Sequence, residues 1–208
     1  MSIDWSLLIG STKDVILGGA AIVGSVVAVK GLSTWRRQLR GQVEYDLARR
    51  ILRLTYQYRD AIHAVRHPAM WNPEMPAPPE EKVKTMSAEQ IRFYGRFKAY
   101  EKRWDRVSEA RSLLYPELLE SEALWEDEIK DRFAPLLKLE NQLFLRLTHQ
   151  MELENPDVPS QDKEAIGKLI DRKSDILYDT LSDDDVYRRE FNEEVEKVAA
   201  KLKAHLRR

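Results

Sequence analysis

An apolar run near the start of the chain is the feature that most constrains its fold. Residues 15–29 carry no charged side chain. As an α-helix they extend only about 22 Å, less than the ~30 Å hydrocarbon core of a bilayer. Extension to Trp35 adds one charge, Lys30, whose long stem lets its ammonium group reach the headgroups. The sequence therefore predicts a single transmembrane helix that ends near Trp35.

The flanks of this segment predict its orientation. Trp35 lies where an interfacial aromatic residue is expected, and Arg36, Arg37 and Arg40 follow it, so that with Lys30 these residues form the predicted membrane interface. The N-terminal flank offers only Lys13. The positive-inside rule then puts the N-terminus outside and the bulk of the chain in the cytoplasm, with membrane lipid as the first partner.

Two alternatives compete with a transmembrane helix. One is a buried or interfacial helix of a protein without a span. The other is a signal peptide cleaved after the small-residue sequence Val26-Val27-Ala28. Asp4 and Asp14 precede the apolar run, which argues against a signal peptide because such peptides start with a positive region.

Small residues recur along the apolar segment. Ala20, Gly24 and Ala28 are spaced by four, and Gly31 falls on the same helical face. Small residues at this spacing let two helix backbones approach closely in lipid, which makes these four residues candidates for homo-oligomerisation. Glycine and alanine are also common in spans that do not pair.

The rest of the chain predicts an all-α fold. Apolar residues separated by three and four mark one face of a helix that Pro68 ends: Leu39, Val43, Leu47, Ile51, Leu54, Tyr58, Ile62 and Val65. We expect a tail and transmembrane helix over 1–35, a juxtamembrane amphipathic helix over 36–67, a proline-rich strap over 68–86 and a helical bundle over 87–208. The fold class is then a transmembrane helix followed by an elongated cytoplasmic bundle of four to five helices.

The strap begins with "PAMWNPEMPAPPEE", which has too many prolines for a helix. Met70, Trp71 and Met75 are too apolar for a solvated linker. We expect the strap to lie against the helices.

A helix with an aromatic seam follows the strap. Ser87 and Gln90 have capping-box spacing at its start. Its stripe alternates by four and three: Phe93, Phe97, Tyr100, Trp104, Val107 and Leu114. Basic residues lie between these aromatics, as in nucleic-acid platforms: Arg92, Arg96, Lys98, Lys102, Arg103 and Arg106. Because the aromatics share one seam, we expect them to be buried in the core, and nucleic acid is not the expected partner.

Prolines and caps predict the later helices. Pro116 fits the first turn of a third helix that carries Leu137, Phe144, Leu147 and Met151, and Pro135 is expected to kink or divide it. Ile166 to Leu181 marks a fourth helix, and the acidic run ending at Asp185 caps a fifth.

Charge is balanced overall, with Lys+Arg 34 against Asp+Glu 35, but uneven locally. Arginine dominates residues 36–67, and acidic side chains dominate residues 116–159. Opposite balances on two long helices predict that the two pack with complementary flanks. The alternative is that both sets of charges face solvent or lipid headgroups.

No motif for catalysis is present. The chain has no cysteine, which excludes disulfides, thiolate metal sites and cysteine nucleophiles. Phosphate-loop, dinucleotide, zinc-protease and nucleophile-elbow patterns are absent. We therefore predict neither a catalytic residue nor a cofactor. The best metal candidate is Asp60, His63 and His67, spaced along one helical face, although a structural role for these residues is the simpler interpretation.

The sequences "GLSTWRRQLRGQVEYDLARRILRLTYQYRDAIHAVRHPAM" and "MSAEQIRFYGRFKAYEKRWDRV" resemble an uncharacterised family of bacterial, single-pass, membrane-anchored helical proteins. The resemblance implies a bacterial inner-membrane location and no known activity. With the patterns above it favours a scaffold or adaptor with an unknown protein partner. The alternatives are an oligomerising membrane-active effector and a basic binder of anionic lipid or nucleic acid.

Overall fold

A computed structural model describes the backbone of residues 5–170 and 176–207, and the side chains from residue 24 onward within these ranges except those of residues 26 and 127. The described residues form helices and connecting segments without a strand, as the all-α prediction requires. The chain divides into two compact units, Met1–Asp46 and Leu47–Arg208. Helix α1 (Trp5–Arg66) belongs to both, because the boundary falls within it.

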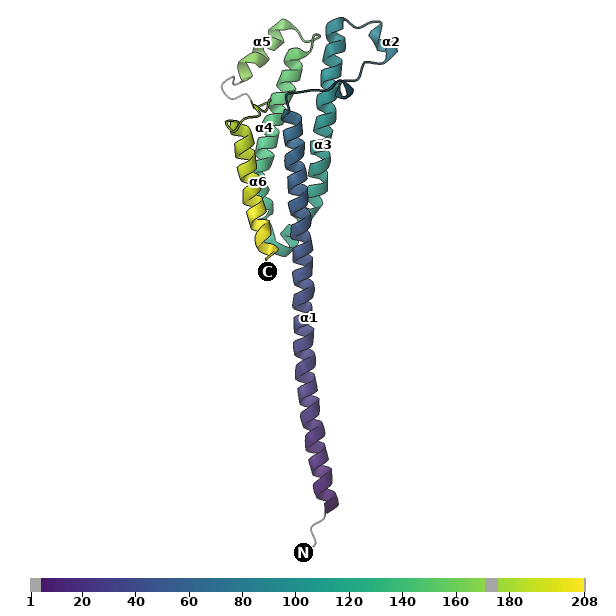
Figure 1. Ribbon diagram of the computed structural model, residues 1–208, viewed down its shortest axis with the longest axis vertical. Helices are drawn as coiled ribbons and strands as arrows, with labels where there is room; N and C mark the ends of the chain where they lie inside the picture. Colours follow the sequence, from purple (N-terminus) through teal and green to yellow (C-terminus); the bar gives the residue numbers. More distant parts are fainter. Residues whose placement is uncertain (1–4, 171–175, 208) are drawn as a thin grey trace. The chain divides into compact units, whose positions relative to one another are not determined.

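The second unit is a bundle of α1 from Leu47 onward with α3 (Ala88–Trp125), α4 (Lys130–Glu154) and α6 (Val186–His205). Neighbouring helices run in opposite directions, so that the chain passes up and down the bundle (Figure 1). Their inward faces form one apolar core, which includes Leu47, Ile51, Phe133, Leu143 and Phe191. Burial of this surface is the main force that holds the helices together.

The predicted charge complementarity between α1 and the acidic segment appears at Arg50. Its guanidinium donates to Glu117 at 2.9 Å and to Glu120 at 3.0 Å, both on α3. The pKa of Arg50 is raised by the hydrogen bond to Glu117, against the opposing effect of burial.

The strap lies against the bundle as expected. It contains a short turn, η1 (Asn72–Glu74), and one turn of helix, α2 (Glu80–Val83). A β-carbon at Gly95 of α3 would lie 3.3 Å from Met75 Cβ, which shows how closely the strap approaches the helix. The capping box of Ser87 and Gln90 is confirmed at the start of α3.

Two predicted boundaries are wrong. Pro116 lies inside α3 and Pro135 inside α4, and neither starts or divides a helix. Each proline leaves free the carbonyl four residues earlier, on Ser112 and Asp131, and these residues are exposed, so that water can bind the carbonyl. The chain turns instead at η2 (Glu126–Glu128), where Glu126 has a φ of 58°.

The predicted fourth helix is also shorter than expected. Helix α5 (Ser160–Leu169) ends before Ile176, and residues 176–185 form a loop. The amide of Asp179 donates to the Arg66 carbonyl at 2.8 Å. The Arg66 guanidinium in turn donates to the carbonyls of Ile176 and Tyr178. These contacts use the backbone groups that a helix would pair internally.

Within the described residues, no helix is long and apolar enough to cross a membrane. The predicted span over residues 15–35 is therefore not found there. Ten of its 21 side chains, those of residues 15–23 and 26, lie outside the described residues. From residue 24 onward, Lys30, Arg36 and Arg37 interrupt the apolar sequence.

Candidate functional site: an aromatic groove with an acidic rim

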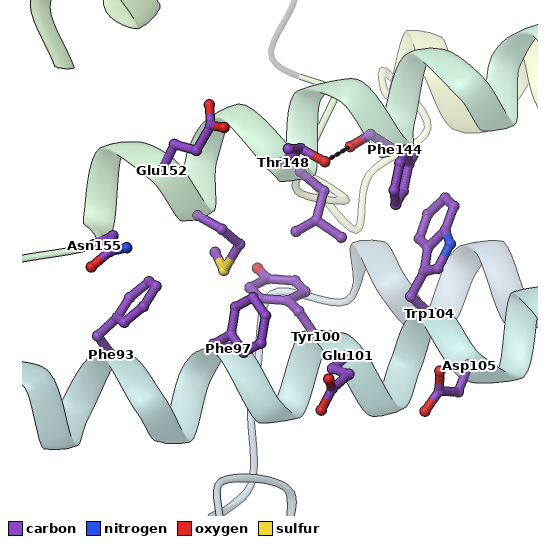
Figure 2. Close-up of a pocket in the computed structure, with 12 residues that line it drawn as sticks. Phe93, Phe97, Tyr100, Glu101, Trp104, Asp105, Phe144, Thr148, Glu152 and Asn155 are labelled. Atoms are coloured by element: carbon purple, nitrogen blue, oxygen red, sulfur yellow. Dashed lines mark hydrogen bonds between the residues drawn. The ribbon is translucent and has the colours of Figure 1, made fainter. Parts of the chain in front are cut away.

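A groove lies between α3 and α4 in the second unit (Figure 2). Its cavity volume is about 360 Å³, within the range of small ligand sites. Three buried side chains form its floor: Tyr100, Leu147 and Met151. Helix pitch accounts for this arrangement, since Leu147 and Met151 are one turn apart and face Tyr100 of the antiparallel helix.

Aromatic rings form the walls of the groove. At one end Trp104 and Phe144 have ring centroids 4.8 Å apart, and at the other Phe93 and Phe97 are 6.0 Å apart. Phe97 remains 41% exposed and Phe144 remains 48% exposed. The expectation that the whole aromatic seam of α3 is buried is therefore wrong for Phe97, because α3 and α4 meet along the floor and leave the outer rings uncovered.

Carboxylates lie along the rim. Glu101 and Asp105 are one turn apart on α3, and Glu152 stands on α4 across the groove (Figure 2). Lys98 neutralises Glu101 through an ion pair. Within the described part of the chain, Asp105 and Glu152 form no ion pair, and no basic side chain lines the groove. The rim therefore carries negative charge beside an apolar floor.

The one ionisable group on the floor stays neutral. Burial, together with a hydrogen bond to Tyr178, raises the pKa of Tyr100 far above its usual value. Its hydroxyl is therefore protonated at physiological pH and adds no charge. The groove therefore offers apolar and aromatic surface with an acidic edge. Such a surface is suited to binding a partner or ligand.

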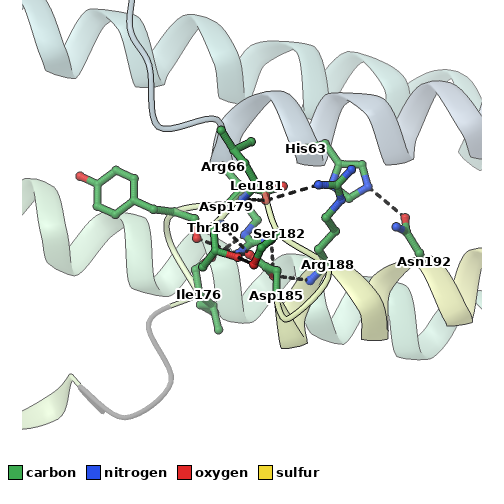
Figure 3. A network of polar contacts seen from close by, with 11 residues as sticks. His63, Arg66, Ile176, Asp179, Thr180, Leu181, Ser182, Asp185, Arg188 and Asn192 are labelled. Atoms are coloured by element: carbon green, nitrogen blue, oxygen red, sulfur yellow. Dashed lines mark hydrogen bonds and ion pairs between the residues drawn. The ribbon is translucent and has the colours of Figure 1, made fainter.

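A polar network ties the C-terminal end of α1 to the start of α6 (Figure 3). Arg66, only 1% exposed, makes a bidentate contact with Asp185 at 3.0 and 2.9 Å. Burial alone would raise the pKa of Asp185, but hydrogen bonds from Arg66, Arg188 and Thr180 outweigh it and lower the pKa. Asp185 is also the N-cap of α6, as the sequence predicts.

The structure does not bring the metal candidates together. Asp60 accepts hydrogen bonds from Arg59. His63 Nε2 lies 3.0 Å from Asn192 Oδ1, and His67 Nδ1 lies 3.2 Å from the Ala69 carbonyl oxygen. Among the residues that the structure describes, no group of three or more His, Asp or Glu side chains is placed to hold a metal ion.

Two basic residues of α3 are engaged in contacts with other segments of the bundle. Arg103 is buried and donates to the carbonyls of His67 and Ala69 and to Glu74. Arg96 pairs with Glu154 of α4. These contacts remove two of the cations that a nucleic-acid platform would need.

The predicted interface and oligomerisation residues lie in the first unit. Lys30, Trp35, Arg36, Arg37 and Arg40 are exposed, and Arg40 pairs with Glu44 at 2.9 Å. Gly24, Ala28 and Gly31 are also exposed, with open space above both glycines, whereas the side chain of Ala20 lies outside the described residues.

Sequence reasoning identified the aromatic stripe but missed the rim. Glu101 and Asp105 repeat at i and i+4 beside that stripe, a signal that was available, whereas Glu152 requires knowledge of how the helices pair. Comparison with protein-family models, curated proteins and solved structures found no match. The resemblance described above thus stays a prediction.

Proposed function

We propose that the chain is a helical adaptor, attached to a membrane by a transmembrane segment within residues 15–35, that binds a partner in the α3–α4 groove. The exposed aromatic walls of the groove are the observation that carries this proposal. Phe97 and Phe144 leave apolar surface in water beside a packed core, and a bound partner would remove that surface from water.

Sequence and exposure support the membrane attachment. Residues 15–29 have no charge, and the apolar residues Val27 and Val29 within this range, and Leu32 after it, are exposed. Trp35 and the arginines after it have the order expected at a cytoplasmic headgroup layer. The bundle would then lie on the cytoplasmic side.

Membrane attachment is tested by fractionation. We expect the full chain to stay with membranes after an alkaline wash, and a chain that begins at Gln42 to remain in the supernatant. A full chain that is monomeric in buffer without detergent would contradict the proposal.

Partner binding is tested by crosslinking in cells. A photoreactive amino acid replaces Phe97 in the groove, and a matched variant carries it at Leu113, which is exposed on α3 outside the groove. We expect a discrete crosslinked species from position 97 alone. The same species from both positions, or none from position 97, would count against an adaptor.

A further inference from the structure

We infer that the occupant of the α3–α4 groove is a positively charged amphipathic helix of a partner protein. This inference rests on the proposed function, because it specifies the partner of the same groove. It follows from the length, the composition and the charge of the site.

The groove has the length of a short helix. Its lining runs from Phe93 to Asp105 on α3 and from Phe144 on α4 to Asn155, the residue that follows α4. Eleven to twelve residue steps at 1.5 Å give about 16–18 Å, or roughly three helical turns. Three turns present apolar side chains at i, i+3 or i+4, and i+7, which is the usual pattern for a helix in an apolar groove.

The walls supply anchor sites for such side chains. The pair Trp104–Phe144 closes one end, and Phe93 and Phe97 flank the other (Figure 2). Met151 adds a buried thioether to the floor. Aromatic residues dominate binding energy at protein interfaces because they bury much apolar area at little entropic cost.

The rim selects the charge of the partner. Asp105 lies beside one wall and Glu152 beside the other, so that a helix seated between them would place its two flanks near carboxylates. Lysine or arginine on those flanks gains favourable interactions, whereas acidic flanks are repelled. Lys98, whose Nζ lies 6.0 Å from the centroid of the Phe97 ring, neutralises Glu101, so that Asp105 and Glu152 set this preference.

A fluorescent peptide tests the inference. The probe is a 14-residue helix-forming peptide with leucines at i, i+3 and i+7 and lysines on its flanks. One control peptide has glutamate for every lysine, and another has the same residues shuffled so that the leucine stripe is lost. Binding is measured by anisotropy on the full chain in phosphatidylcholine nanodiscs, with empty nanodiscs as the blank.

We expect saturable binding of the lysine peptide and at least tenfold weaker binding of both controls. Asp105→Asn with Glu152→Gln should weaken binding roughly fivefold, or about 1 kcal/mol, as expected for the loss of two exposed ion pairs. Phe97→Ala should weaken it about tenfold, as expected for loss of an aromatic anchor. Asp162→Asn, an exposed carboxylate on α5, is the matched control and should leave affinity unchanged.

Equal affinity for the glutamate peptide, or no effect of the two carboxylate substitutions, would overturn the inference. So would saturation of the groove by tetraphenylphosphonium without binding of the peptide, because the occupant would then be a small organic cation. Crosslinking at position 97 to a partner without a basic helix would also overturn it while leaving the adaptor proposal intact. A full chain that does not stay with membranes and gives no crosslinked species from position 97 would refute the adaptor proposal itself.

Discussion

At the scale of single residues, buried charges determine where the helices of the bundle meet. Arg66 and Asp185 are both almost fully buried and form an ion pair. Each also makes hydrogen bonds to nearby backbone groups. Glu140, 2% exposed, accepts the Tyr58 hydroxyl at 2.6 Å and a guanidinium nitrogen of Arg111 at 2.9 Å. Such groups stabilise only one arrangement, because any other leaves a charge without its partner.

Neutralising Asp185 should destabilise the fold strongly. Asp185→Asn keeps a side chain that can cap α6 but leaves the Arg66 guanidinium buried without a counter-charge. We expect the free energy of unfolding to fall by about 3–5 kcal/mol, as measured by urea unfolding followed by circular dichroism. The exposed neighbour variant Asp183→Asn should stay within about 0.5 kcal/mol of the parent chain.

His63 should make stability depend on pH near neutrality. Burial lowers its pKa below 6.5, the neighbouring Arg188 and Arg59 also lower it, and Asn192 and Asp179 oppose this. The folded chain therefore binds fewer protons than the unfolded chain. The contribution of the neutral His63 imidazole to stability is complete above pH 6.5. It is lost as the pH falls through the folded-state pKa of His63.

Urea unfolding between pH 8 and pH 5 measures this effect. The free energy of unfolding of the parent chain should decrease more steeply toward acid than that of His63→Gln. Parallel pH profiles for the two chains would show that the imidazole does not titrate differently on folding.

At the scale of elements, one arginine fixes the strap. Arg103 of α3 holds the carbonyls of His67 and Ala69 and the carboxylate of Glu74 at 2.6–3.0 Å. Arg103→Ala should release residues 68–86 and cost roughly 3 kcal/mol, because charged hydrogen bonds contribute about 1.5–3 kcal/mol each and are not additive. Limited proteolysis should then cut within the strap, while Lys102→Ala, exposed on the same helix, should leave it protected.

The turn between α3 and α4 is held in a strained conformation. Glu126 has φ 58° and ψ −153°, a region that only glycine adopts without cost. Glu126→Gly should therefore raise the free energy of unfolding by about 1 kcal/mol, after allowance for the greater freedom of glycine in the unfolded chain. A lower urea midpoint for this variant than for the parent would show that contacts of the glutamate matter more than backbone strain.

The same turn shows where sequence patterns stop predicting structure. No glycine or proline lies between Pro116 and Pro135 to mark this turn. The turn allows Trp125 to stack on His205 and Ile129 to enter the core. Helix propensity is a property of the local sequence and does not reflect such tertiary contacts. By contrast, the ends of α1 at Arg66 and of the strap at Ser87 were predictable, because Pro68 and the capping box act locally.

At the scale of the molecule, the groove was only half predictable. Periodicity placed Phe93, Phe97, Tyr100 and Trp104 on one face of α3, but it could not show that α4 covers only the inner part of that face. Exposure depends on how two helices meet, which follows from their ridges and grooves and not from either sequence alone. The acidic rim has the same origin, since it combines carboxylates that lie far apart in the chain.

The division of the chain into two units leads to the last prediction. The buried core consists of residues from Leu47 onward, and no described residue from 24 to 46 is buried. A chain that begins at Gln42 keeps every core residue and retains five residues of α1 before Leu47, which limits fraying of the shortened helix. Removal of residues 1–41 should therefore leave the bundle folded, with a urea midpoint close to that of the full chain.

Circular dichroism, urea unfolding and groove binding can be compared on the two chains. We expect the free energy of unfolding to change by less than about 1 kcal/mol, because no buried apolar area is removed. Membrane attachment should be lost, and affinity for the lysine peptide should stay the same. A shortened chain that unfolds or aggregates would show that residues 1–41 stabilise the bundle, and the membrane segment and the groove would then have to be treated as one functional element.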